Sequence, residues 1–146
     1  MENKTVSASV DFQVEFYDVD SMNIVWHGNY VKYMERARCA LLSKLRYDYA
    51  AMEKSGFAFP VVDIHVKYIR PLRFLQKVRI TATIVEYENC LKLAYKIEDL
   101  ETGMVLTKAE SMQMAVDLKT MESQFVSPKV FLDKVEYYLK NGEADA

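Results

Sequence analysis

The feature that most limits the fold of this chain is one long apolar helix pattern set among several strand patterns. Between residues 30 and 45, apolar side chains recur at helical spacing, as in Tyr30, Met34, Ala37 and Leu41. Further apolar residues widen this arc beyond one stripe, which predicts a helix covered on more than one side. A sheet must bury one face, and this helix is the only large element available to cover it.

Strand patterns lie on both sides of the helix in the sequence. The predicted strands span residues 6–16, 59–69, 78–84, 91–97 and 104–118. The first is the clearest, because apolar and polar residues alternate strictly along it and end on the apolar Phe16. The last has apolar residues on both faces, which predicts a strand covered on both sides.

Two shorter helices are predicted after the long one. The first spans residues 48–55 and is closed by Gly56. The second begins at Ser127 and Pro128, with the serine as its cap, and ends at Gly142. The predicted class is therefore α+β, a curved antiparallel sheet wrapped around one long helix with a further helix at the C-terminal end.

The bulk composition narrows the function classes. With 146 residues and no internal repeat or linker, the chain is expected to form a single domain over residues 1–146. The net charge of −2 gives no electrostatic case for nucleic acid or an anionic membrane as partner. No segment has the pattern of a signal peptide or a membrane span, so we expect a cytoplasmic protein.

Several cofactor and nucleophile motifs are missing from the sequence. There is no nucleophile elbow, no P-loop and no dinucleotide glycine fingerprint. The two cysteines, Cys39 and Cys90, and the two histidines, His27 and His65, have no metal-ligand spacing. We therefore expect neither a metal nor another cofactor.

The candidate site lies between the first strand and the long helix. Asp18 and Asp20 come first, and Trp26, His27 and Gly28 stand directly before the helix. The first N–H groups of a helix lack intrahelical partners and carry partial positive charge. A carboxylate facing such donors is suited to attack on a polarised carbonyl group. From the pattern alone, turn formation or helix capping explains either acid more simply than catalysis does.

The run over residues 18–30, Asp-Val-Asp-Ser-Met-Asn-Ile-Val-Trp-His-Gly-Asn-Tyr, resembles the signature of the 4-hydroxybenzoyl-CoA thioesterase family, including its YbgC-like members. Residues 35–38 and 66–73 resemble later segments of the same family. The resemblance implies the hotdog fold, a dimer with one continuous sheet and active sites at the subunit interface, and often a tetramer. One departure is Asn23, which replaces the usual glycine but tolerates the same left-handed turn.

The resemblance also implies roles for single residues. Asp20 takes the position of the catalytic acid, as general base or nucleophile. The residue at His27 supplies a backbone N–H to the thioester oxygen, and its imidazole lies beside the substrate. Other expected substrate contacts are Trp26 and Gly28, together with Tyr30 in the acyl pocket.

The phosphate groups of the thiol carrier need basic partners. Arg70, Arg73 and Lys92 are the candidates, although solvation at the surface is the simpler explanation for each. The leading hypothesis is a hydrolase of acyl-CoA or acyl-carrier-protein thioesters. The alternatives are an acyl-thioester hydratase or dehydratase, and a module that binds acyl thioesters or a carrier protein without turnover.

Overall fold

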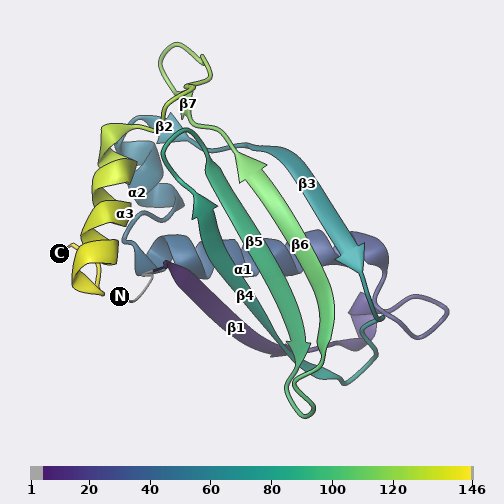
Figure 1. The fold of residues 1–146 in the computed structure, drawn as a ribbon. Coiled ribbons are helices and arrows are strands. Elements are labelled where there is room, and N and C mark those ends of the chain that lie inside the picture. Colours follow the sequence, from purple (N-terminus) through teal and green to yellow (C-terminus); the bar gives the residue numbers. More distant parts are fainter. Residues whose placement is uncertain (1–4, 146) are drawn as a thin grey trace.

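The computed structural model describes residues 5–145, in which an antiparallel sheet wraps around one long helix (Figure 1). The strands are β1 (Ser7–Gln13), β2 (Phe57–Ala58), β3 (Val61–Tyr68), β4 (Lys77–Glu86), β5 (Leu91–Asp99), β6 (Val105–Gln113) and β7 (Val116–Asp117). The helices are α1 (Tyr30–Lys44), α2 (Tyr49–Lys54) and α3 (Lys129–Asn141). The five long strands form one sheet in the order β1-β4-β5-β6-β3, and β2 pairs with β7.

The core lies between α1 and the inner face of the sheet. Ala37, Leu41 and Leu42 of α1 are fully buried, and they face the alternate residues of the central strands, such as Ile80 and Leu93. Every neighbouring pair of strands is antiparallel. This arrangement confirms the predicted hotdog class, because the one helix with a wide apolar arc is the element that the sheet covers.

The predicted strand over residues 104–118 is wrong in two respects. Lys108 and Glu110 are exposed on the outer face of β6, so the strand is covered on one side only. The chain also leaves the sheet after Gln113 and pairs again as β7 with β2.

The first strand is shorter than its alternation predicts. It ends at Gln13, and a 3-10 turn over Phe16–Asp18 follows. Two hydrogen bonds close the turn: the Glu15 amide donates to the Asp18 carboxylate at 2.9 Å, and the Asp18 amide donates to the Glu15 backbone carbonyl at 3.0 Å. Phe16 therefore points outward and is 76% exposed, instead of continuing the inward-facing set.

The helix ends follow the sequence signals with one exception. Gly56 and Gly142 both have a positive φ, 91° and 74°, as expected of residues that end helices. At the start of α3 the cap position is occupied by Pro128. The Ser127 hydroxyl is buried without a hydrogen-bond partner among the described residues, so it does not cap the helix.

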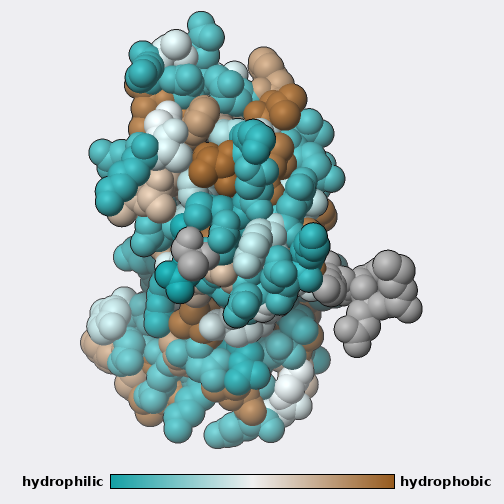
Figure 2. Space-filling view, turned by 90° about the vertical axis from the view of Figure 1, so that its left-hand side faces the viewer, coloured by the Kyte–Doolittle hydropathy of each residue, from teal (hydrophilic) through white to brown (hydrophobic). Residues whose placement is uncertain are grey.

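Strand β3 forms an open edge of the sheet. It pairs with β6 on one side only, and seven of its eight residues are exposed. Val61, Val62, Ile64 and Tyr68 leave large apolar side chains on this edge in the single chain. The side of the molecule that carries α3 differs from this edge, because apolar groups there are scattered among hydrophilic ones (Figure 2).

Among residues 5–145, no helix combines the length and the apolar character needed to cross a membrane.

Candidate active site

A small hairpin carries the two acids. Val19 and Val25 form an isolated antiparallel bridge, and the amide of Asp20 donates to the carbonyl of Ile24 at 2.8 Å. Asn23 closes the turn with φ 62°, and its amide donates to the Asp20 carbonyl at 2.9 Å. The left-handed turn expected at Asn23 is thus present, and an asparagine serves where the family resemblance has glycine.

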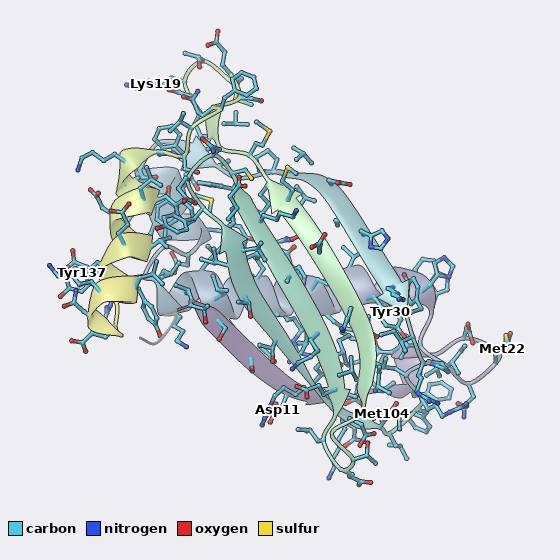
Figure 3. All side chains as sticks on the ribbon, viewed as in Figure 1. Asp11, Met22, Tyr30, Met104, Lys119 and Tyr137 are labelled. Atoms are coloured by element: carbon cyan, nitrogen blue, oxygen red, sulfur yellow. The ribbon has the colours of Figure 1, made fainter. Side chains whose placement is uncertain are left out.

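The carboxylate of Asp20 is held by its own loop. Its Oδ1 accepts a hydrogen bond of 2.8 Å from the amide of Met22, which fixes the side chain against the hairpin. No donor among residues 5–145 occupies Oδ2, and the residue is only half-buried. One carboxylate oxygen is therefore positioned and the other is free to accept a proton. Met22 marks the exposed tip of this loop (Figure 3).

The hairpin is fastened to the rest of the chain from two sides. The amide of Val25 donates to the Leu72 carbonyl at 2.8 Å, and Ile24 forms a bridge with Arg73. The carbonyl of Asp18 accepts hydrogen bonds from the amide of Trp26 at 3.0 Å and from the Asn29 side chain at 2.8 Å. These bonds fix the loop relative to the start of α1.

The chain enters α1 through a short turn of tighter helix. A 3-10 turn over His27–Asn29 precedes α1, and Asn29 already has helical dihedrals. Its side chain bonds the Asp18 carbonyl and does not cap the helix. The amides of His27 and Gly28 form no hydrogen bond within the described part of the chain. Two N–H donors therefore stand free at this turn, at the positive end of the helix dipole.

Gly28 leaves room for the ring of Trp26. A Cβ atom placed at Gly28 would lie 2.4 Å from the nearest carbon of the indole, closer than any van der Waals contact. The indole also lies beside the His27 imidazole, with ring centroids 5.2 Å apart. The half-exposed indole ring of Trp26 therefore packs on the turn that carries the free N–H groups.

Tyr30 belongs to the core of the single chain. It is 2% exposed, and its hydroxyl accepts a long hydrogen bond of 3.4 Å from the Leu72 amide. Its burial raises the pKa of the phenol above the ordinary value. The expected contact between Tyr30 and an acyl group stays a prediction, because the ring is covered by Tyr68 at 4.7 Å between centroids.

Tyr68 is a site residue that the sequence reasoning missed. Its hydroxyl donates to the carbonyl of His27 at 2.9 Å, so the last residue of β3 holds the turn before α1. The only sequence signal was its place in the segment 66–73, which resembles the family but gave no role to the tyrosine. The contact joins positions 41 residues apart, and local patterns cannot reveal it.

The three basic candidates are not brought together. Arg73 lies beside the hairpin through its bridge with Ile24, and Arg70 follows the end of β3 nearby. The end of β5 that lies near the hairpin is Asp99, which accepts a hydrogen bond from Gln76. Lys92 is at the opposite end of this strand, seven residues earlier. At about 3.3 Å per residue, the separation along the strand is roughly 23 Å. A single chain does not place Lys92 at this site.

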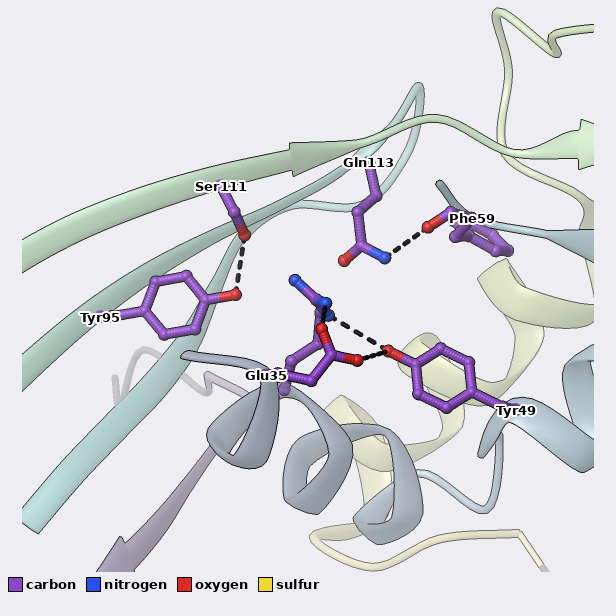
Figure 4. Close-up of polar contacts among 7 residues, drawn as sticks. Glu35, Tyr49, Phe59, Tyr95, Ser111 and Gln113 are labelled. Carbon is purple, nitrogen blue, oxygen red and sulfur yellow. Dashed lines mark hydrogen bonds and ion pairs between the residues drawn. The ribbon is translucent and has the colours of Figure 1, made fainter. Parts of the chain in front are cut away.

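A second polar cluster lies along α1 (Figure 4). Arg38 is 5% exposed, forms an ion pair with Glu35 and donates to the Tyr49 hydroxyl at 3.3 Å. Tyr49 in turn donates to Glu35 at 3.0 Å, and its burial raises its pKa to about 12. Glu35 and Arg38 are three residues apart on α1, a spacing at which helical side chains meet. A buried cation needs such partners, so this cluster fixes α2 against α1.

The hairpin and the helix start together provide the parts for acyl transfer to water. A carboxylate oxygen is free to take a proton, and two N–H groups are free to stabilise negative charge on a carbonyl oxygen. Carboxylate and donors are held by one network of backbone hydrogen bonds.

Known proteins resemble this chain in both sequence and fold. Residues 14–135 match the model of a family described as the thioesterase-like superfamily. Over 113 residues the chain is 34% identical to the putative acyl-CoA thioesterase YneP of Bacillus subtilis, covering 77% of this chain and 81% of that protein. Over 106 residues it is 28% identical to the acyl-CoA thioester hydrolase YbgC of Escherichia coli O157:H7, covering 72% and 78%.

Solved structures show the same architecture. The DHNA-CoA thioesterase from Staphylococcus aureus superposes with a TM-score of 0.78 at 24% identity, covering 94% of this chain and 95% of that one. A protein from the same organism solved in complex with CoA superposes with a TM-score of 0.80 at 19% identity, covering 97% and 87%. At these identities the likeness establishes the shared fold.

Proposed function

This chain belongs to the thioesterase-like superfamily, and on that basis we propose that it hydrolyses acyl-CoA thioesters with Asp20 and the amides at the start of α1. Two of the matched relatives, YneP and YbgC, are named as a putative acyl-CoA thioesterase and an acyl-CoA thioester hydrolase. The observation that carries the proposal is the carboxylate of Asp20, whose Oδ1 is held by the Met22 amide while Oδ2 stays free. The same network of backbone hydrogen bonds holds the hairpin of Asp20 and the turn with two unpaired N–H groups.

In the proposed reaction Asp20 acts as general base. Its free oxygen takes a proton from water as the water oxygen bonds to the thioester carbonyl carbon. The carbonyl oxygen gains negative charge, which the amides of His27 and Gly28 stabilise; one such donor contributes about 3–4 kcal/mol in other enzymes. The C–S bond then breaks, and the thiolate takes the proton from Asp20. Direct attack by Asp20 to give an anhydride, followed by hydrolysis, uses the same groups.

We further propose that two copies pair along β3. Its open edge and exposed apolar side chains are features that proteins rarely leave uncovered. An antiparallel pairing would join the two sheets and set the Tyr68 end of one strand beside the Val61 end of the other. The active site of one copy would then lie near residues that precede β3 in its partner.

A large apolar hollow occupies that position in each copy. Its volume is about 600 Å³, and Met52, Phe57, Phe59, Pro60 and Leu118 are among its lining residues. Its size suits a small organic group, and its lining offers little polar surface. In the proposed dimer, this hollow of one copy receives the acyl group whose thioester is hydrolysed at the Asp20 of the other.

The function is tested by thiol release from a panel of acyl-CoAs that range from short aliphatic to aryl and long-chain groups. Release of CoA with an equal amount of free acid is the expected result. Water addition to an enoyl-CoA without thiol release would instead identify a hydratase. Tight binding without turnover, on CoA and on carrier protein alike, would identify a binding module.

A further inference from the structure

Three lysines form a row across the outer face of the sheet, which faces the viewer in Figure 1. Lys96 of β5 is the direct cross-strand partner of Lys108 on β6, and Lys108 is the direct partner of Lys67 on β3. With neighbouring strands about 4.8 Å apart, the row spans roughly 10 Å. Like charges placed directly opposite one another destabilise a sheet, so the row is unfavourable without an anion.

The rest of the chain does little to neutralise this row. Within residues 5–145, Lys67 and Lys108 form no ion pair or side-chain hydrogen bond. Lys96 is 3.5 Å from Glu98, an exposed pair of little energetic value. On the same face, Arg79 is held by two hydrogen bonds to Asp11, at 2.7 and 3.0 Å. On the outer face, Arg79 is therefore closely paired with a carboxylate, whereas the three lysines of the row have no close anionic partner among the described residues.

The row borders a hollow of about 490 Å³. Thr81 and Thr83 line it with hydroxyl groups, and His65 and Glu110 lie opposite each other at its side. A hollow of this volume is the size of a small-ligand site. The alternate residues of the same strands face α1, so the sheet separates this hollow from the core.

We propose that this hollow binds a small anion that carries at least two phosphate groups, alone or as part of a nucleotide. Lysine ammonium groups bind phosphate well, and a row of three matches a ligand with more than one anionic group. The Thr83 hydroxyl adds a hydrogen-bond donor to the hollow, whereas the Thr81 hydroxyl shares a hydrogen bond of 2.8 Å with Ser9. A second copy placed here on a two-fold axis through the row would set lysines against lysines, so charge favours the anion as occupant.

The test is calorimetric titration of the full chain at low salt with adenosine 3′,5′-bisphosphate, ATP and inorganic pyrophosphate. The variant carries Lys67→Gln, Lys96→Gln and Lys108→Gln together. Its matched control removes the same charge elsewhere through Lys54→Gln, Lys119→Gln and Lys129→Gln. We expect affinity to fall about tenfold or more in the first variant and less than about twofold in the control.

Two further variants sharpen the result. Glu110→Gln removes the one carboxylate in the hollow, so affinity should rise about twofold to fivefold. Asp20→Asn should leave binding unchanged, which separates this inference from the fate of the proposed hydrolase. The preferred ligand identifies the source, since adenosine 3′,5′-bisphosphate represents the head of CoA and ATP a free nucleotide.

Three outcomes would overturn the inference. The first is that none of the three ligands binds at low salt. The second is an equal loss of affinity in the row variant and the charge-matched control, which would show attraction by net charge alone. The third is a change of assembly mass in the row variant with phosphate binding intact, which would make this face a contact between copies.

Discussion

The hydroxyl of Tyr68 donates a hydrogen bond of 2.9 Å to the carbonyl oxygen of His27 and thereby joins the end of β3 to the turn before α1. The same turn presents the free amides of His27 and Gly28. The open strand edge and the candidate oxyanion site are therefore mechanically connected. We therefore expect a change at the end of β3 to alter the position of these two amides.

Replacing Tyr68 with phenylalanine should weaken catalysis more than stability. The ring and its contact with Tyr30 remain, while the hydrogen bond to His27 is lost. We expect kcat/KM to fall about fivefold to twentyfold, with a change in the free energy of unfolding of only about 1 kcal/mol. Steady-state thiol release and urea unfolding measure the two effects. Unchanged kcat/KM would show that the bond does not position the turn.

Adding a methyl group at Gly28 should displace the indole of Trp26. A Cβ there would lie 2.4 Å from the ring, so Gly28→Ala is expected to shift the tryptophan fluorescence and lower kcat/KM. Because Trp26 is the one tryptophan in the chain, its emission reports this site alone. In the double variant Trp26→Ala and Gly28→Ala, the clash is absent, so the two losses should not add. Additive losses would contradict the packing explanation.

Charging the open edge of β3 should separate the proposed dimer. Ile64→Lys places an ammonium group on the exposed edge strand, and Val85→Lys makes the same kind of change at an exposed position on β4. We expect Ile64→Lys to halve the mass in sedimentation and to lower kcat/KM at least about tenfold, with Val85→Lys unaffected. A monomeric Ile64→Lys protein with full activity would show that one chain suffices for the site.

Cys90 should be slow to alkylate in the folded protein. Its burial and its contact with Glu86, at 3.0 Å from Sγ to Oε2, raise the pKa of the thiol to about 11. Raising the pKa of a thiol keeps it protonated, so below pH 9 the thiolate fraction is about a hundredfold lower than in the unfolded chain. Mass spectrometry after iodoacetamide treatment should show labelling that increases up to about pH 11. Glu86→Gln should speed it, and equally fast labelling of folded and unfolded chains would contradict the prediction.

The residues of the core were open to prediction because their signals are local. The alternation along β4 and β5 and the helical spacing from Tyr30 to Leu41 are set by which side of each element is buried. Alternation failed at Phe16, where the hydrogen bonds between Glu15 and Asp18 end the strand pattern and turn the chain. An apolar residue after such a turn can point outward.

The site was predictable only in part. The resemblance assigns roles to Asp20 and to the amide of His27, and these roles stay predictions. It gives none to Tyr68, which contacts the same turn across 41 residues. Lys92 was grouped with Arg73 as a phosphate ligand on residue type alone, and the sheet places it at the far end of β5. Neither the open edge of β3 nor the register of Lys67, Lys96 and Lys108 can be known before the strands are paired.

The most direct test of the proposed mechanism is the single-turnover rate of thiol release by Asp20→Asn on the best acyl-CoA substrate. Asparagine retains the size of the side chain and an oxygen that can accept the hydrogen bond from the Met22 amide, but it cannot take a proton from water. The predicted result is a rate about 10²–10⁴-fold below that of the wild-type protein, with unfolding and assembly mass unchanged. A rate within a few-fold of wild type would contradict the assignment of Asp20 as the group that activates water or attacks the thioester.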